Sequence, residues 1–483
     1  MPETPHHSPP SLSSKSFKAA AWSLVGRGGG ELLKLVSSLI LTRLLFPEAF
    51  GLMGTAISVM IMVQLFTDTG TRLSIIQNPR GGEPEFLNTA WMIAIMRGVG
   101  LGVIMAAISW PVALFFNKPN LAPILMLLAV TPLISGLENP AMALVIRNMK
   151  GQRQVLYDLL PQVGGFICTV SLAWIFRSVW ALAVGALFVS LMKLAASYLI
   201  EPYRPRLTWD AESGRALVNF GKFVLLNTMI SWAATNLDRF VIGKMLGMDT
   251  LGIYTIGLNL GIAVELFFNQ ILGNSYFPAL SQVLSDRPRR VRVFMRSLVA
   301  LMALAAPLLV TLALFSNEVI AILYDTRYAT AGAVLFWISM RGLVRIISVI
   351  SGPTFFAFGA PRCETIAMGY SLAALVLLLP AGIHLYGMTG ALIAILASCT
   401  VGTLVECHYI VRHLEFPVVS LTVPIAQAAA VTLVSFTGHA VLRPFLDAPK
   451  WGAIPFMLAI LALAGITSLI TWKLAQRIIP PSN

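Results

Sequence analysis

A chain of 483 residues in which 57% are apolar and only 11% are charged is not an ordinary soluble protein, because soluble domains carry about a quarter charged residues. The formal net charge of +13 does not indicate a nucleic-acid partner, since the Lys and Arg residues lie at the ends of apolar segments and form no basic face with interleaved aromatics. The composition predicts an all-α integral membrane protein, and its 4 cysteines, without paired or metal-ligand spacing, predict no metal centre.

The apolar segments begin after a polar stretch at residues 1–18, which is rich in Pro and Ser and which we interpret as a cytoplasmic tail. From residue 19 onward, runs long enough to cross a hydrocarbon core of ~30 Å recur between charged and Pro/Gly clusters. They predict about fourteen transmembrane helices. The expected ranges are 19–44, 49–68, 87–116, 121–146, 156–176, 178–200, 219–246, 250–278, 294–324, 329–358, 364–385, 388–411, 418–441 and 452–474.

The basic residues are distributed unevenly over the two sides of this arrangement. With the N-terminus placed in the cytoplasm, Lys and Arg at the inner ends of the helices clearly outnumber those at the outer ends. Cytoplasmic loops of membrane proteins carry such an excess. The asymmetry therefore predicts that both termini are cytoplasmic and that the number of spans is even.

An internal repeat links the two halves of the chain. Residues 43–68 align without gaps on residues 244–269 at a constant offset of 201, which places Gly51 opposite Gly252. Six predicted spans separate the copies, so both copies run in the same direction, as in parallel-repeat transporters. A chance match between two aliphatic segments is the alternative. The repeat predicts an N-lobe at 19–200, a cytoplasmic linker at 201–218, a C-lobe at 219–411 and two appended helices with a C-terminal tail at 412–483.

Ionisable residues inside two predicted spans are the first candidate site. Arg27, Glu31 and Lys34 are spaced i, i+4, i+7 and share one face of the first helix, and Arg341 and Arg345 are spaced i, i+4 on the tenth. A charge at the bilayer centre costs about 2.5–3.5 kcal/mol, so such groups face a partner or a cavity. One acid does not neutralise two bases, which favours an anionic ligand; an internally paired cluster that only fixes helix packing is the alternative.

The seventh span predicts a polar lining for a cavity between the lobes. Asn227, Ser231, Thr235 and Asp238 lie on one face of this helix, followed by Arg239. The helix is the repeat partner of the first span, so each lobe presents a polar first helix. A purely structural pair of Asp238 with Arg239 is the alternative interpretation.

Five further polar residues are candidates for a gate or for a coupling-ion site. Gln64 and Asp68 correspond through the repeat to Glu265 and Asn269, a polar i, i+4 pair in each copy, for which helix capping is the alternative. Glu138, directly before Asn139 and Pro140, combines an acid with a helix break. Either it forms a proton or cation site, or it is a satisfied acid at a kink.

Two segments carry a resemblance to a known family. They are LTRLLFPEAFGLMGTA at residues 41–56 and NLDRFVIGKMLGMDTLGIYTIG at residues 236–257. On these segments the chain resembles the polysaccharide transporter branch of the multidrug/oligosaccharidyl-lipid/polysaccharide exporter superfamily. The resemblance extends over most of the chain, through both lobes and the two appended helices.

This resemblance implies a flippase, not an enzyme, that translocates undecaprenyl-diphosphate-linked oligosaccharide repeat units across the bacterial inner membrane by alternating access. The basic residues Arg27, Lys34, Arg341 and Arg345 would then receive the diphosphate through charge-assisted hydrogen bonds. Expected partners are the lipid-linked oligosaccharide, membrane lipids, a polymerase with its chain-length regulator, and H⁺ or Na⁺; no cofactor is expected.

Other functions compete with this one. A multidrug antiporter of the same superfamily generally has twelve spans and acidic drug sites, which the two extra spans and the buried bases disfavour. A membrane polysaccharide polymerase or glycosyltransferase needs a large external loop, and no predicted loop is long enough. A non-transporting scaffold in a polysaccharide assembly complex leaves the buried charges unexplained.

Overall fold

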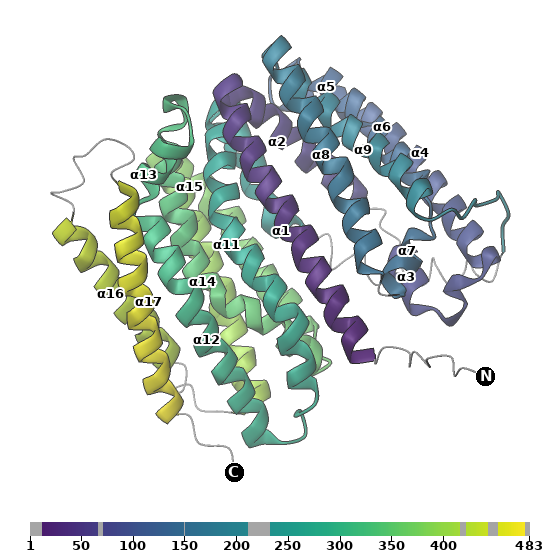
Figure 1. Ribbon diagram of the computed structural model, residues 1–483. Helices are drawn as coiled ribbons and strands as arrows, with labels where there is room; N and C mark the ends of the chain where they lie inside the picture. Colours follow the sequence, from purple (N-terminus) through teal and green to yellow (C-terminus); the bar gives the residue numbers. More distant parts are fainter. Residues whose placement is uncertain are drawn as a thin grey trace, which may run out of the picture. The chain divides into compact units, whose positions relative to one another are not determined.

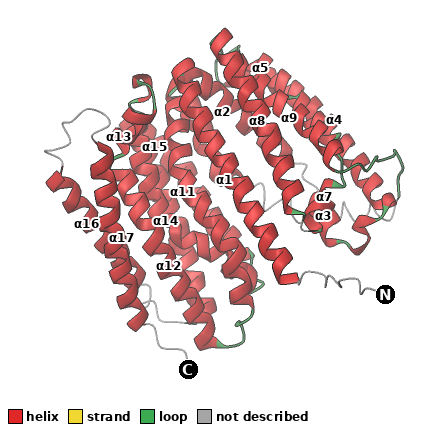
Figure 2. Cartoon of the chain, viewed as in Figure 1, coloured by secondary structure: helices red, strands yellow, loops and turns green. Residues whose placement is uncertain are grey.

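The computed structural model describes residues 12–65, 71–148, 150–210, 232–415, 422–442 and 453–478. Within these ranges every regular element is a helix, and loops connect the helices (Figure 2). The chain divides into two compact units. Unit 1 consists of Met1–Leu45 and Thr55–Met229, and unit 2 of Phe46–Gly54 and Ile230–Asn483. The lobe boundaries drawn from the sequence stay a prediction.

Unit 1 is built from α1 to α9, and unit 2 from α11 to α17 together with the first residues of α2 (Figure 1). In unit 1 the helices are α1 (Leu12–Leu44), α2 (Pro47–Leu65), α3 (Thr71–Gln77), α4 (Pro84–Phe115), α5 (Leu121–Leu128), α6 (Val130–Gly136), α7 (Met142–Arg147), α8 (Gly151–Phe176) and α9 (Trp180–Ile200). In unit 2 they are α11 (Met248–Ser281), α12 (Arg287–Leu314), α13 (Ser316–Leu323), α14 (Ala331–Ala357), α15 (Arg362–Leu414), α16 (Thr422–Leu442) and α17 (Ala453–Ile478), preceded by a helical stretch at 232–245.

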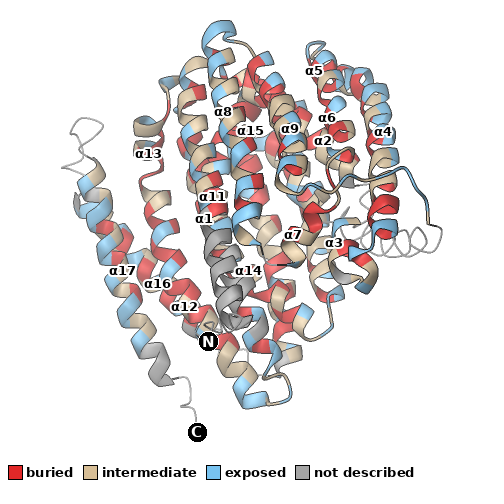
Figure 3. Cartoon of the chain, turned by 45° about the vertical axis from the view of Figure 1, so that its right-hand side comes forward, coloured by how far each residue is buried: buried red, intermediate tan, exposed pale blue. Residues whose placement is uncertain are grey.

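Length and hydropathy identify membrane-spanning helices directly. In the described ranges, 8 helices are long and apolar enough to cross a bilayer, and two shorter apolar stretches, Leu121–Gly136 and Met457–Lys473, accompany them. The protein is therefore a helical membrane protein. Large apolar side chains are exposed on many helices, as expected for surfaces that face lipid. Figure 3 shows exposed positions along α17, where the exposed apolar residues include Leu458, Leu463, Ile466, Leu469 and Ile470.

Some predicted spans do not coincide with single straight helices; the range 294–324, for example, is divided into α12 and α13. The range 121–146 is divided into α5, α6 and α7, with the break after Glu138 at Asn139 and Pro140. The helix α15 contains both predicted spans 364–385 and 388–411, separated by non-helical backbone at Tyr386 and Gly387. Gly387 has φ 57°, a conformation that glycine adopts without steric cost. It lets the chain reverse without a longer loop.

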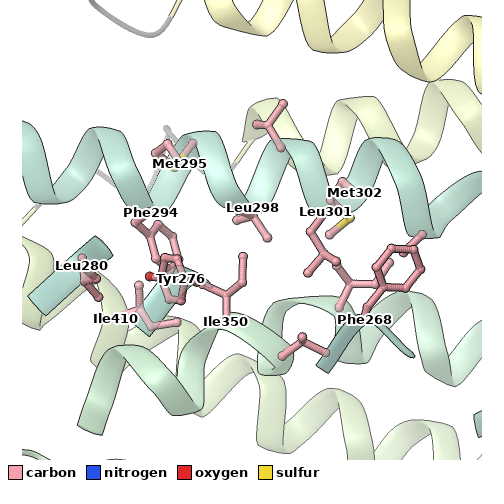
Figure 4. Packing of buried hydrophobic residues seen from close by; sticks show 14 of the residues in the cluster. Phe268, Tyr276, Leu280, Phe294, Met295, Leu298, Leu301, Met302, Ile350 and Ile410 are labelled. Atoms are coloured by element: carbon pink, nitrogen blue, oxygen red, sulfur yellow. The ribbon is translucent and has the colours of Figure 1, made fainter. Parts of the chain in front are cut away.

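A cluster of buried apolar residues holds unit 2 together. It joins α11, α12, α14 and α15 through side chains that include Phe268, Tyr276, Phe294 and Ile350 (Figure 4). Burial on this scale stabilises packing mainly through close contact, because lipid tails are as apolar as the side chains themselves. The cluster provides the rigid frame for the polar residues described below.

The helices α2 and α11 cross at the two glycines that the repeat pairs. A Cβ on Gly51 would lie 1.9 Å from the carbonyl oxygen of Met248, and a Cβ on Gly252 would lie 1.9 Å from that of Pro47. The contact is reciprocal, because Pro47 corresponds to Met248 at the same offset of 201 residues that relates Gly51 to Gly252. All four residues belong to unit 2. The crossing is therefore a local two-fold relation between the repeat copies.

Candidate functional site

A cavity of about 200 Å³ lies inside unit 2. It is bordered by the helical stretch at 232–245, by Asn269 of α11, by α14 and by both halves of α15. Its charged lining residues are Asp238, Arg341, Arg345, Glu364 and Glu406. A cavity of this size accepts a group such as a hydrated ion or a phosphate, because sites for drug-sized molecules are about 300–1,000 Å³.

The two guanidinium groups of α14 share one carboxylate from α11. Arg345 donates from Nε to Oε1 of Glu265 at 2.6 Å, and Nη2 of Arg341 lies 3.6 Å from Oε2 of the same residue. The Glu265 side chain is 10% exposed, against 15% for Arg341 and 33% for Arg345. The i, i+4 spacing on α14 brings both bases to one face, so a single acid bridges them. One positive charge of the pair remains after this neutralisation.

Asp238 is held by its own helix and by α11. Its Oδ1 accepts the backbone N–H of Arg239 at 2.9 Å, and its Oδ2 accepts the hydroxyl of Tyr254, a fully buried residue. The Asp238 side chain is therefore fixed in place at the cavity wall. Thr235, one turn earlier, also lines the cavity and donates to the carbonyl oxygen of Trp232.

Two further acids of the cavity come from opposite halves of α15. Glu406 is buried beside Ser348 and Ser351 of α14, and its Oε2 has no hydrogen-bond partner among the described residues. Glu364 lies against Gly352, where a Cβ would come within 3.1 Å of its Oε1. With Glu265 and Asp238, carboxylates outnumber guanidiniums at this site. The arrangement can bind an anionic oxygen at Arg341 and Arg345 and can also hold a proton or a cation among the acids.

Several of the site residues predicted from the sequence lie at this cavity. Thr235, Asp238, Asn269, Arg341 and Arg345 line it, and Glu265 contacts both arginines. Arg239 is half-buried next to the site. Asn269 donates from Nδ2 to the carbonyl oxygen of Glu265 one turn earlier.

The other predicted residues lie elsewhere. Lys34 is an exposed residue of α1 and Gln64 a half-buried residue of α2, whereas Glu138 lines a separate cavity in unit 1. Arg27 and Glu31 belong to α1, but their side chains are outside the described part. Asp68, Asn227 and Ser231 also lie outside the described residues.

Glu364 and Glu406 were not predicted as site residues. Glu406 is an acid inside the predicted span 388–411, so the criterion that selected Arg341 and Arg345 applies to it equally. Glu364 stands at the start of a span, where an acid also satisfies a helix N-terminus, and the sequence does not separate the two roles.

Comparison with known proteins agrees with the helical membrane architecture. A family model described as a polysaccharide biosynthesis protein matches residues 40–332. The chain belongs to this family. Among curated proteins of similar sequence is the lipopolysaccharide biosynthesis protein WzxC of Escherichia coli (strain K12), 24% identical over 70% of this chain and 69% of its own length. Another is the succinoglycan biosynthesis transport protein ExoT of Rhizobium meliloti (strain 1021), 25% identical over 68% of this chain and 66% of its own length.

Solved structures give this polysaccharide biosynthesis protein a known fold. The lipid II flippase MurJ in an inward closed conformation superposes with a TM-score of 0.74 at 12% sequence identity. The match covers 95% of this chain and 99% of the MurJ chain. A match of this extent includes both units and reaches into the C-terminal helices α16 and α17 of unit 2.

Proposed function

We propose that the protein is a flippase that translocates undecaprenyl-diphosphate-linked oligosaccharide repeat units across the bacterial inner membrane for cell-surface polysaccharide export. The observation that carries the proposal is the fold, which matches a lipid II flippase over 95% of this chain and includes buried guanidiniums in its interior. Relatives named for lipopolysaccharide biosynthesis and succinoglycan transport support the same substrate class. On this proposal both termini are cytoplasmic and the protein performs no chemical step.

The head group of the substrate is the part that the basic residues would bind. Arg341 and Arg345 both line the cavity, and Glu265 is their shared salt-bridge partner among the described residues. Their remaining N–H donors would bind the diphosphate, although the cavity as a whole holds more carboxylates than guanidiniums. Arg27 and Lys34 of α1, in unit 1, are the other residues that we propose to bind the head group. Guanidinium groups bind phosphate oxygens through two parallel hydrogen bonds, which makes them more selective than a single ammonium group.

Coupling to H⁺ or Na⁺ is proposed for the same cavity. Glu406 is buried and its Oε2 has no described partner, so protonation or a cation would remove an uncompensated charge. Glu138, Glu265, Gln64, Asp68 and Asn269 remain the other candidates for coupling or gating. A polymerase and a chain-length regulator are the proposed partners downstream.

The acids of this cavity also favour a second candidate function, a cation-coupled multidrug antiporter. Carboxylates that outnumber guanidiniums would accept a cationic drug. The relatives named for polysaccharide biosynthesis and the match to MurJ through α16 and α17 favour the flippase.

A deletion strain tests the proposal. Loss of the gene is expected to stop polymer export and to leave lipid-linked repeat units on the cytoplasmic leaflet, measured by leaflet-selective labelling of the sugar. Complementation with Arg341→Gln/Arg345→Gln should restore less than about a tenth of the export, since loss of charged hydrogen bonds costs about 1.5–3 kcal/mol each. Arg287→Gln, which alters an exposed arginine of the same unit, is the control and should restore export fully. Full export in the deletion strain would refute the proposal.

A further inference from the structure

A second polar cavity, also of about 200 Å³, lies inside unit 1. It is lined by Arg72 of α3, by Trp91 and Arg97 of α4, by Glu138 and Asn139 between α6 and α7, and by Tyr157 of α8. Its three charged lining residues are thus two arginines and one glutamate. The residues meet because α3, α4, α7 and α8 come together at the end of unit 1 where α1 begins (Figure 1).

The carboxylate of this cavity is already engaged. Glu138 Oε2 accepts the hydroxyl of Tyr157, and the positive charges of Lys193 and Arg72 act on it. Lys193 of α9 lies with its Nζ 5.9 Å from the centre of the Tyr157 ring. Asp158 is close enough to act on Tyr157 but does not line the cavity. The lining thus holds two bases and one acid, and the nearby Lys193 and Asp158 offset each other, so a cation would meet net repulsion here.

The helix break holds this site rigid. The Asn139 N–H donates to Ser197 Oγ at 3.1 Å, and its Nδ2 donates to the carbonyl oxygens of Glu201 at 2.6 Å and Tyr203 at 2.9 Å. The carbonyl oxygen of Leu137 accepts from Trp91 Nε1 at 3.4 Å. Because these hydrogen bonds already fix the cavity wall, a ligand that binds here loses less free energy to the ordering of side chains.

We propose that this cavity is an anion site that binds a phosphate-ester group through Arg72 and Arg97, with Trp91 and Tyr157 as its aromatic walls. Two guanidiniums from different helices match phosphate oxygens on two sides, and Glu138 keeps the Tyr157 hydroxyl oriented beside them. The volume admits a phosphate or diphosphate and excludes an oligosaccharide. With a cytoplasmic N-terminus the site lies at the cytoplasmic end of unit 1.

The phosphate can come from a lipid-linked diphosphate, from a bilayer phospholipid or from the aqueous phase. The interpretation that this anion site loads the lipid-linked substrate rests on the proposed flippase function. Anion binding itself does not depend on that function, because it is measured on the purified protein. Anion binding here without any lipid translocation would contradict the flippase and leave the anion site standing.

Calorimetric titration of the purified full-length protein in detergent tests this site with three probes: inorganic pyrophosphate, farnesyl diphosphate and dihexanoyl phosphatidylglycerol. In Arg72→Gln/Arg97→Gln, the Kd of the best probe should rise at least about tenfold, since each bond to a charged group is worth about 1.5–3 kcal/mol. The control Arg153→Gln, which removes a half-exposed arginine of unit 1, should leave the Kd unchanged. The probe with the lowest Kd identifies the source of the phosphate.

Glu138→Gln separates an anion site from a cation site. Glutamine still accepts the Tyr157 hydroxyl but removes the negative charge, so anion binding should become equal or tighter. If the double glutamine variant does not fold, Arg72→Lys/Arg97→Lys keeps the charge and loses the bidentate geometry, and its Kd should rise severalfold. An unchanged Kd in the arginine variants, or loss of binding in Glu138→Gln, would overturn the inference.

Discussion

At the scale of single residues, two buried glutamates of unit 2 differ in how their charge is compensated. Glu265 bridges Arg341 and Arg345, whereas Glu406 lies beside two serines and has a carboxylate oxygen without a described partner. Burial penalises both charges, but Glu265 recovers more of the penalty, because it forms close ion pairs with both arginines whereas Arg345 acts on Glu406 from beyond ion-pair distance. The first acid therefore stabilises the fold, and the second is retained at a cost in stability.

Replacement of each acid by glutamine should show this difference in thermal unfolding of the purified protein. Glu265→Gln leaves two partly buried guanidiniums without their shared carboxylate and should destabilise the protein by about 2–3 kcal/mol, less than for a fully buried pair because Arg345 is one third exposed. Glu406→Gln should be neutral or stabilising.

Glu415→Gln provides the matched control. This acid pairs with Arg287 and Arg290 and is 60% exposed, so its loss should cost less than about 1 kcal/mol. Equal destabilisation by Glu265→Gln and Glu406→Gln would show that the two acids are equivalent and would contradict the distinction.

At the scale of helices, the crossing of α2 and α11 explains why glycine occupies the paired positions of the repeat. The backbones approach so closely that each glycine faces a carbonyl oxygen of the other helix. Small residues permit such contacts between membrane helices, where packing replaces the hydrophobic effect. The repeat and its offset follow from the sequence, but the contact does not, because neither copy shows which helix it packs against.

Alanine at the crossing should therefore be disruptive. Gly51→Ala and Gly252→Ala each place a methyl group against a backbone carbonyl that has no rotamer to change, and each should destabilise the protein by about 1–3 kcal/mol. The double variant should cost less than the sum, since helices already separated by one methyl group accept the second. Thermal unfolding of the purified variants measures both effects.

Gly54→Ala is the control on the same helix. Its added methyl group would meet Thr255 Oγ1 at 3.4 Å, an ordinary contact, so this variant should unfold within about 0.5 kcal/mol of the parent protein. If Gly54→Ala destabilised the protein as much as Gly51→Ala, the close contact between α2 and α11 would not explain the loss of stability.

The sequence predicted the architecture better than it predicted the sites. Hydropathy located the helices because each must satisfy its own backbone in lipid, and even the reversal at Gly387 coincides with the gap between two predicted spans. The sequence indicated a helix break at Asn139 and Pro140, which the structure shows between α6 and α7. It did not predict the further division of the range 121–146 between α5 and α6. Tertiary contacts hold the break between α6 and α7, among them those of Asn139 with Glu201 and Tyr203.

For the sites, the sequence identified buried charges but not their partners. Arg341 and Arg345 share a helix face, which their spacing reveals, whereas Glu265 reaches them from another helix 80 residues away in the chain. Arg72 and Arg97 were not expected to share a cavity with Glu138, because three separate elements bring them together. Spacing along one helix predicts a shared face, and only the fold shows what that face meets.

At the scale of the whole molecule, translocation of a lipid-linked oligosaccharide can be measured by reconstitution of the purified protein. The purified protein in liposomes that carry an undecaprenyl-diphosphate-linked oligosaccharide should make the inner-leaflet sugar accessible to an external lectin or glycosidase. Arg341→Gln/Arg345→Gln should lower the rate at which the sugar becomes accessible at least about tenfold, because the variant loses charged hydrogen bonds to the diphosphate. Liposomes with the parent protein that expose no more sugar than empty liposomes, while a cationic dye is transported, would contradict the flippase and favour the antiporter.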